Sequence, residues 1–309
     1  MKEYKYYLGL DIGGTKCAVS VGRSLGDHID VIERLEVATT DTPEHTLGQL
    51  TDTAVGWVRQ YGIERAGISS GGPLDSERGV ILSPPNLRKA WHGFDIVGFV
   101  RERIGVGARL ENDANASAVA EWRFGAGRGV KDMVFMTFGT GLGAGIILNG
   151  ALLRGANGNA GEIGHVRLSD SGPVGYGKAG SAEGFCSGGG IARLATMMAS
   201  ERGIAIPDGL STKEIFKRAE MGDGLCLDAV RVSAEKFALV ISMLTDILNP
   251  EAIVVGGVFM RNYDLFMKIM TPIIEREALG ESLRVLKILP SGLSENIGDV
   301  AALAIAVED

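Results

Sequence analysis

The chain has 309 residues, of which 45% are hydrophobic and 22% charged, and a formal net charge of −7. This balance excludes a disordered chain, and an acidic sequence without a cluster of lysines or arginines argues against a nucleic-acid partner. No apolar run approaches the ~20 residues that span a bilayer, and no signal peptide is evident, so we expect no membrane partner. Three scattered cysteines fit the reducing cytoplasm.

The first half of the chain predicts buried strands that alternate with helices. Thr42 and Pro43 are typical of a helix start, and the short apolar runs end in glycine or polar residues, as strands do. The expected strands are residues 6–10, 17–21, 66–69 and 109–111, and the expected helices are residues 43–61, 94–103 and 113–124.

The same pattern begins again near residue 133. The expected strands are residues 133–137, 146–148 and 252–255, and helices are expected at 228–248, from Tyr263 onward and over 299–307. In the longest of these helices we expect Val232, Leu239, Met243 and Ile247 to form the buried stripe.

These elements predict an α/β protein of two units packed around a shared ligand cleft, because nothing between them has the composition of a linker. Each unit opens with a strand, a glycine-rich turn and a returning strand. We place the boundary near residue 118. This gives a small domain of residues 1–118 with 296–309, and a large domain of residues 119–295.

The first glycine-rich turn suits phosphate binding. Asp11 ends a strand and precedes Gly13 and Gly14, whose N–H groups can bind phosphate oxygens, while Thr15 adds a hydroxyl. A carboxylate repels phosphate, so Asp11 is better suited to hold Mg²⁺, directly or through water. Taken alone, this turn is better explained as an ordinary hairpin with an acidic residue in the turn.

A second glycine-rich turn, Gly139–Gly145, also lies between two strands, unlike the dinucleotide motif, which lies between a strand and a helix. Two such turns in separate units suggest two loops that close on one polyphosphate. Gly256 and Gly257 follow another buried strand and suit the approach of a base or ribose. The residues expected to bind ATP are Asp11, Gly13, Gly14, Thr15, Lys16, Thr140, Gly141, Gly143, Gly256 and Gly257.

Asp113 stands where a predicted strand passes into a predicted helix. At that place an aspartate is a natural helix N-cap. The junction also faces the expected cleft, where a carboxylate can accept a proton from a substrate hydroxyl. Glu162 and His165 lie within one further turn and suit hydrogen bonds to adjacent sugar hydroxyls, although a lone histidine is more often structural.

Two other segments imitate known motifs. Gly67–Gly71 matches the Gly-x-Ser-x-Gly pattern of serine hydrolases, and Asp113 and His165 follow it in the hydrolase order. The residues after it predict a loop, whereas the hydrolase motif requires a helix. Gly172–Lys178 approximates a Walker A loop but lacks the Ser or Thr that should follow. We therefore expect neither site.

Together these motifs resemble the ROK family of sugar kinases and repressors, which has the two-domain actin-like ATPase (ribonuclease H-like) fold. Residues 11–16 and 139–145 are similar to its two phosphate loops, 256–257 to its adenosine loop and 161–165 to its sugar motif. The resemblance implies ATP and Mg²⁺ as cofactors, Asp113 as the catalytic base and a homodimer. The sugar-binding residues that it implies are Gly72, Asn86, Asn112, Glu162, His165 and Glu183.

One segment departs from the family pattern. Most members carry three cysteines there, which hold a structural zinc together with the histidine. Here Val174, Tyr176 and Ser181 stand at the cysteine positions, and none of them is a soft thiolate. We therefore expect no zinc site, which leaves His165 free of a metal.

The expected reaction is transfer of the γ-phosphoryl group of ATP to a hexose. Glucose, phosphorylated at its 6-hydroxyl, is the first choice, and N-acetylmannosamine or another N-acetylhexosamine is the alternative. A sugar-sensing regulator without activity would lack Asp113 or the glycines of the phosphate loops, all of which are present here. Because the chain starts at the first strand, we expect no DNA-binding region of the repressor branch.

Overall fold

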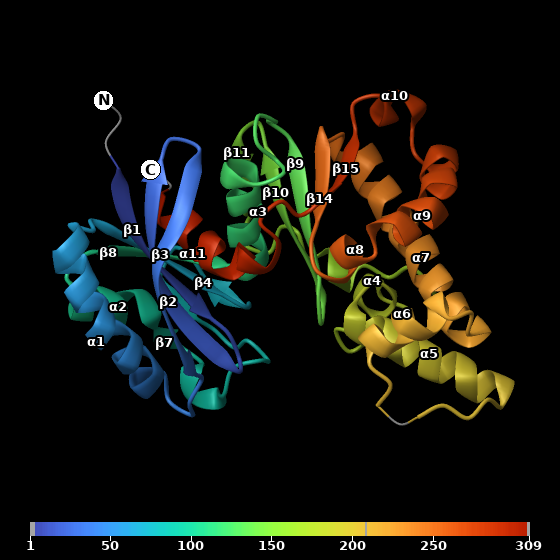
Figure 1. The fold of residues 1–309 in the computed structure, drawn as a ribbon, viewed down its shortest axis with the longest axis horizontal. Coiled ribbons are helices and arrows are strands. Elements are labelled where there is room, and N and C mark those ends of the chain that lie inside the picture. Colours follow the sequence, from blue (N-terminus) through green and yellow to red (C-terminus); the bar gives the residue numbers. More distant parts are fainter. Residues whose placement is uncertain (1–3, 208, 308–309) are drawn as a thin grey trace.

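The computed structural model describes residues 4–207 and 209–307, which form two five-stranded sheets with equivalent strand orders (Figure 1). The first sheet has the order β3 (His28–Ala38), β2 (Lys16–Leu25), β1 (Lys5–Ile12), β4 (Arg65–Ser70) and β8 (Gly107–Asn112). The second has the order β11 (Ala151–Leu152), β10 (Leu142–Leu148), β9 (Met133–Phe138), β14 (Ala252–Val255) and β15 (Lys287–Pro290). In both sheets the first three strands are antiparallel and the last two join in parallel, so the architecture is duplicated.

The first sheet is covered by helices on both faces. Helices α1 (Pro43–Tyr61) and α2 (Ile96–Ile104) pack on one face, where Leu8 and Leu10 of β1 are buried. Between these leucines, Gly9 points to α11 (Ile297–Val307) on the other face. A Cβ atom at the neighbouring Gly67 would lie only 2.0 Å from the Ala302 carbonyl oxygen, so glycine in the sheet and alanine in the helix allow an unusually close contact.

Helix α3 (Asp113–Phe124) and helix α11 pack against each other between the two sheets (Figure 1). Strand β9 therefore has two buried faces: Met133 and Phe135 join the core around these two helices, while Val134 and Met136 join the larger core on the other side. That larger core is built from α4 (Ala182–Phe185), α5 (Gly188–Arg202), α6 (Thr212–Glu220), α7 (Gly224–Leu248), α8 (Val258–Arg261), α9 (Tyr263–Glu277) and α10 (Gly280–Leu283). The predicted boundary at residue 118 falls inside α3 and stays a prediction.

Short elements complete the structure near the strand ends. Strands β5 (Leu74–Asp75), β6 (Val80–Ile81) and β7 (Phe94–Asp95) form a small antiparallel sheet, and β12 (Val174–Gly175) pairs with β13 (Lys178–Ala179) in a tight hairpin. Single 3₁₀ turns occur at Lys89–Trp91, Ile163–His165 and Ser294–Asn296. None of the described helices is both long enough and apolar enough to cross a membrane.

Several sequence-based expectations need correction. The helix expected from residue 94 begins at Ile96, because the Asp95 side chain accepts a hydrogen bond from the Gly98 amide and caps it. The buried stripe expected on α7 is only partly right: Val232 and Met243 are half-buried against the core, but Ile247 is 76% exposed, and Phe237 and Ile241 are fully buried. Helix α7 is apolar around much of its circumference and contacts several other helices, so periodicity alone does not select the buried face. Strand β3 and helices α5 and α6 were not predicted.

Candidate active site

A cavity of about 910 Å³ lies where parallel strands of both sheets end. The first sheet contributes its glycine-rich turn and the start of α3, and the second sheet contributes its own turn and the segment before the 3₁₀ turn at 163–165. Eleven of the predicted site residues line this cavity: Gly14, Thr15, Gly72, Asn86, Asn112, Asp113, Thr140, Gly141, Gly143, Glu162 and Glu183. Outside its lining lie Asp11, Gly13, Lys16, His165, Gly256 and Gly257.

The first turn is fixed by contacts within the protein. The Gly13 amide donates to the Lys16 carbonyl at 3.1 Å, and the Thr39 hydroxyl donates to the Gly13 carbonyl at 2.6 Å. A Cβ atom on Gly14 would lie 2.3 Å from the Asn86 carbonyl oxygen. Gly14 therefore lets the loop that carries Asn86 close on the turn, and this brings a predicted sugar residue beside a predicted phosphate loop.

Asp11 is the penultimate residue of β1 and lies beside the start of α11, where Gly298 approaches its carboxylate. Burial, followed by repulsion from Asp299 and Asp113, raises the pKa of Asp11 to about 6. A carboxylate held among other carboxylates fits a bound cation, which would relieve that repulsion. The described residues include no group of three or more acidic, His or Cys side chains suited to a metal.

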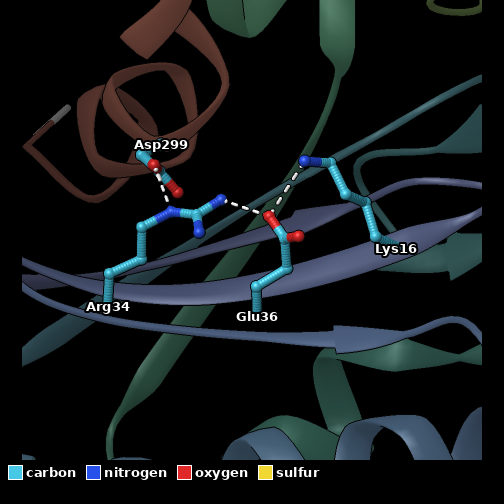
Figure 2. Close-up of polar contacts among 4 residues, drawn as sticks. All are labelled: Lys16, Arg34, Glu36 and Asp299. Atoms are coloured by element: carbon cyan, nitrogen blue, oxygen red, sulfur yellow. Dashed lines mark hydrogen bonds and ion pairs between the residues drawn. The ribbon is translucent and has the colours of Figure 1, made fainter.

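Lys16 belongs to a chain of ion pairs instead of the cavity wall, as Figure 2 shows. Its ammonium contacts Glu36 at 3.0 Å, Glu36 contacts Arg34 at 2.7 Å, and the Arg34 Nε contacts Asp299 at 2.7 Å. These four side chains connect β2 and β3 with the first turn of α11. The contact predicted between Lys16 and ATP stays a prediction.

Asn112, and not Asp113, is the N-cap of α3. The Asn112 side-chain oxygen accepts hydrogen bonds from the amides of Ala114 at 3.0 Å and Asn115 at 3.3 Å. Asp113 is the first residue of the helix, and its side chain is accessible from the cavity. Protein surrounds its other sides, and this desolvation, together with the charge of Glu162, raises the pKa of Asp113, although the Ala114 amide opposes the shift.

Behind Asp113, the buried Glu111 organises the junction between β8 and α3. One of its oxygens accepts hydrogen bonds from the Asn112 amide and from the Asn115 side chain, each at 3.0 Å. Its other oxygen pairs with the Nε of Arg154 at 2.8 Å, in the loop after β11 of the second sheet. Neither residue was assigned a role from the sequence, where the one local signal was an acidic residue next to a polar cap.

The second turn, between β9 and β10, is held from two sides. The Thr137 hydroxyl accepts a hydrogen bond from the Gly143 amide at 3.0 Å, and the Gly139 carbonyl accepts one from the Gly188 amide at 2.7 Å. The latter contact places the N-terminus of α5 against the turn. Arg193, one helical turn into α5, lines the same cavity and was also missed from the sequence. A cation and a helix N-terminus at one glycine turn suit an anionic ligand.

Gly256 and Gly257 lie next to the second turn, since a Cβ atom on Gly257 would lie 2.2 Å from the Phe138 carbonyl oxygen. Gly257 has a positive φ of 69° and is the N-cap of α8. A second cavity, of about 730 Å³, opens between α6 and α8 and is lined by Thr212, Phe216 and Val258 among others.

The sugar motif lies across the main cavity from the first turn. Glu162 lines both the main cavity and an adjoining one of about 430 Å³, and His165 lines only the adjoining one. Glu183 lines the main cavity, with its carboxylate between two backbone amides: that of Tyr176 at 3.1 Å and that of Leu142 at 3.2 Å.

The three cysteine positions of the zinc-binding pattern do not fit zinc. Val174 has no donor atom. The buried Ser181 hydroxyl donates to the Gly175 carbonyl at 2.9 Å and accepts from the Gly184 amide at 3.1 Å. The Tyr176 hydroxyl is hydrogen-bonded to Glu162 at 2.9 Å. None offers a free thiolate or imidazole.

The serine-hydrolase interpretation is wrong. Ser69 is 2% exposed inside β4, and the chain continues into the short strand β5 without the helix that would present a nucleophile.

Comparison with known proteins agrees with this geometry. The ROK family model matches residues 7–309. A glucokinase from Streptomyces coelicolor is 31% identical over 313 aligned positions, which cover 97% of each chain. An N-acetylmannosamine kinase from Escherichia fergusonii is 34% identical over 256 positions, which cover 81% of this chain and 82% of the relative. The crystal structure of a ROK family glucokinase from Streptomyces griseus, in complex with glucose and AMPPNP, has a TM-score of 0.77 at 30% identity and covers 98% of this chain and 99% of that chain.

Each half of the molecule has a five-stranded sheet covered by helices and carries a glycine turn, and a cavity lies between the halves. This arrangement defines the two-domain actin-like ATPase fold, as the sequence predicted. The chain belongs to the ROK family. It is a sugar kinase.

Proposed function

We propose that the protein transfers the γ-phosphoryl group of ATP to the 6-hydroxyl of a hexose, with glucose as the preferred acceptor. The observation that carries this proposal is the position of Asp113. It lies in one cavity with the two glycine turns and with Glu162, and its carboxylate, released from helix capping by Asn112, is accessible from that cavity.

Asp113 acts as the general base. Its carboxylate accepts the proton of the sugar hydroxyl as the oxygen attacks phosphorus, and it orients that oxygen in line with the leaving group. Asn112 and Glu111 hold the start of α3, so the base is positioned before the substrate arrives.

The two turns bind the phosphates. Amides of Gly14, Gly141 and Gly143, with the hydroxyls of Thr15 and Thr140, donate to phosphate oxygens, and Arg193 adds a positive charge on the same side. The nucleoside lies beyond them, along Gly257 and into the cavity between α6 and α8. Asp11 would hold Mg²⁺ through water, and that ion would neutralise charge on the phosphate oxygens.

The sugar side is formed by loops of both sheets. Gly72, Asn86 and Asn112 face the acceptor from the first sheet, and Glu162, His165 and Glu183 face it from the second. Carboxylates and amides at several positions suit a molecule with many hydroxyl groups, each of which needs a hydrogen-bond partner when it leaves water.

Glucose is proposed first because glucokinases are among the relatives that match nearly the whole chain. N-acetylmannosamine is the second candidate, supported by the N-acetylmannosamine kinase at 34% identity.

Three buried free cysteines support a cytoplasmic location, and a homodimer stays a proposal from the family resemblance.

An ADP-release assay with ATP, Mg²⁺ and a panel of hexoses and N-acetylhexosamines tests the proposal. The highest kcat/KM is expected with glucose, and phosphate is expected at the 6-position of the product. If an N-acetylhexosamine has the highest kcat/KM, the preference for glucose is wrong. If no sugar stimulates ADP release, the proposed reaction is wrong.

A further inference from the structure

The β12–β13 hairpin carries the segment in which the family pattern has its zinc ligands, yet here the hairpin holds the sugar motif through side chains of its own. Tyr176 lies at its tip and Lys178 begins its second strand. Tyr176 stands at one of the cysteine positions and Lys178 at none of them. Neither side chain can replace a thiolate, because an ammonium group cannot bind a metal and a neutral phenol binds zinc poorly.

Lys178 holds His165. Its ammonium lies 3.0 Å from the His165 Nδ1 and 2.8 Å from the His165 carbonyl oxygen. A lysine ammonium has donors only, so Nδ1 must be the acceptor, and the proton of the neutral ring is then on Nε2. The ammonium therefore donates a hydrogen bond to the lone pair of Nδ1, as a metal ion would engage that lone pair. It thereby selects the tautomer whose Nε2–H can donate to a ligand.

Tyr176 holds Glu162. Its hydroxyl donates to the Glu162 Oε2 at 2.9 Å, and its ring packs edge-on against the His165 ring with centroids 5.5 Å apart. Tyr176 lines both the main cavity and the adjoining one, so the hydrogen bond lies in the wall that separates them.

The same hairpin reaches the second glycine turn through Glu183. One Glu183 oxygen accepts from the Tyr176 amide, and the other accepts from the Leu142 amide at the start of β10. The hairpin thus contacts Glu162 and His165 directly and is linked to the proposed phosphate loop through Glu183 of α4, with atoms that need no metal.

We propose that Lys178 and Tyr176 replace a zinc ion in this chain: Lys178 orients His165, and Tyr176 orients Glu162, so that both face the sugar. Tyr176 and Lys178 are positioning residues, and the proposal rests on the proposed function because it assigns the acceptor side of the same site. This replacement makes the sugar site independent of zinc.

The variant Tyr176→Phe tests the proposal, because it removes only the hydroxyl and keeps the ring and the backbone contact to Glu183. Loss of the hydrogen bond to the Glu162 carboxylate is expected to raise the KM for the sugar about tenfold, while the KM for ATP changes less than about twofold. Tyr61→Phe is the matched control, since the Tyr61 hydroxyl donates to Glu33 at 2.6 Å on the first sheet, away from the cavity. Its KM values should equal those of the wild type.

A second variant, Lys178→Met, removes the ammonium from His165 and is also expected to raise the KM for the sugar about tenfold and to leave that for ATP unchanged. Metal analysis of the wild-type protein is expected to find less than about 0.1 zinc per chain, and a zinc chelator should leave its thermal midpoint unchanged.

Stoichiometric zinc, or equal KM values for the sugar in the wild type, Tyr176→Phe and Lys178→Met, would overturn the proposal. A parallel increase of both KM values, or lost thermal stability that accounts for the loss of activity, would also overturn it, because the hairpin would then be only structural. These results differ from a failure of the proposed function, in which the wild-type protein itself turns over no sugar.

Discussion

At the residue scale, Asn112 and Asp113 have different roles. Asn112 caps the helix, and this leaves the Asp113 carboxylate available for catalysis. Asn112 caps α3 with a neutral oxygen, and Asp113, one residue later, reaches the cavity with a carboxylate that accepts a hydrogen bond from the Ala114 amide at 2.8 Å. Desolvation raises the pKa of Asp113, which makes the carboxylate a stronger base than an aspartate in water.

We predict that Asp113→Asn lowers kcat by about 10²–10⁴-fold, since proton transfer by a positioned base contributes that much, and changes the dissociation constant of the sugar only a few-fold. Steady-state kinetics and calorimetry measure the two effects. Asp95→Asn is the control, because Asp95 caps α2 on the surface and asparagine caps equally well. More than about a tenth of the wild-type rate in Asp113→Asn would exclude the general-base role.

The raised pKa of Asp11 predicts that the free energy of unfolding depends on pH. Its pKa in the folded protein is about 6, above the ordinary value of 3.8, so the folded state binds this proton more tightly than the unfolded state does. The stability that the group contributes is therefore fully present below about pH 4 and is lost as the pH rises through 6.

Without Mg²⁺ and nucleotide, Asp11→Asn should match the wild type in free energy of unfolding near pH 4 and exceed it by roughly 1–3 kcal/mol above pH 7, because asparagine resembles the protonated acid. Urea unfolding at both pH values measures the difference. The variant should also lose activity if Asp11 holds Mg²⁺. A wild type that is more stable than the variant at pH 7.5 would contradict the assigned cause.

At the element scale, the two glycine turns need glycine for different reasons. A Cβ atom on Gly14 would meet the Asn86 carbonyl at 2.3 Å, whereas one on Gly139 would meet no atom within 4 Å. Gly14 is thus required by the packing of the protein, and Gly139 is free of such contacts while it lines the cavity.

Accordingly, Gly14→Ala should lose roughly 1–3 kcal/mol of stability, because the loop of Asn86 must move, and should raise the KM for the sugar. Gly139→Ala should unfold at the same temperature as the wild type but raise the KM for ATP, because its methyl group occupies space expected for phosphate. Thermal unfolding and KM values for both substrates separate the two. Equal thermal midpoints for both variants would contradict the packing argument.

These turns could be predicted from the sequence because their signals are local: a buried strand, glycines and a returning strand stand next to one another in the chain. The same holds for Asp113 and for the start of α1 at Pro43. Helix α5 was missed because it packs against α7, which lies further along the chain. Strand β3 was missed because it is a half-exposed edge strand in which charged residues interrupt the apolar pattern. Tyr176 and Lys178 could be named from the sequence only as lost zinc ligands or their neighbours, since their contacts to Glu162 and His165 depend on how the hairpin folds back.

At the scale of the whole molecule, the duplicated sheets place one half of the site on each side of a cavity. Helices α3 and α11 form the contact between the halves. Helix α3 begins at the cavity with Asp113, and Asp299 in the first turn of α11 belongs to the ion-pair chain that reaches Lys16 (Figure 2). A relative rotation of the sheets about these helices would change the width of the cavity without unfolding either core.

We therefore predict that the sugar closes the molecule. Gly72, Asn86 and Asn112 on one side and Glu162 on the other contact the acceptor only when the two sides approach, and closure also removes water that would otherwise compete for the phosphoryl group. Small-angle X-ray scattering should show a smaller radius of gyration with saturating glucose than without it, and no change with an acyclic hexitol. Asp113→Asn should close equally well, because closure depends on sugar contacts and not on proton transfer. An unchanged scattering curve for the wild type at saturating glucose would show that the acceptor binds to a cleft of fixed width.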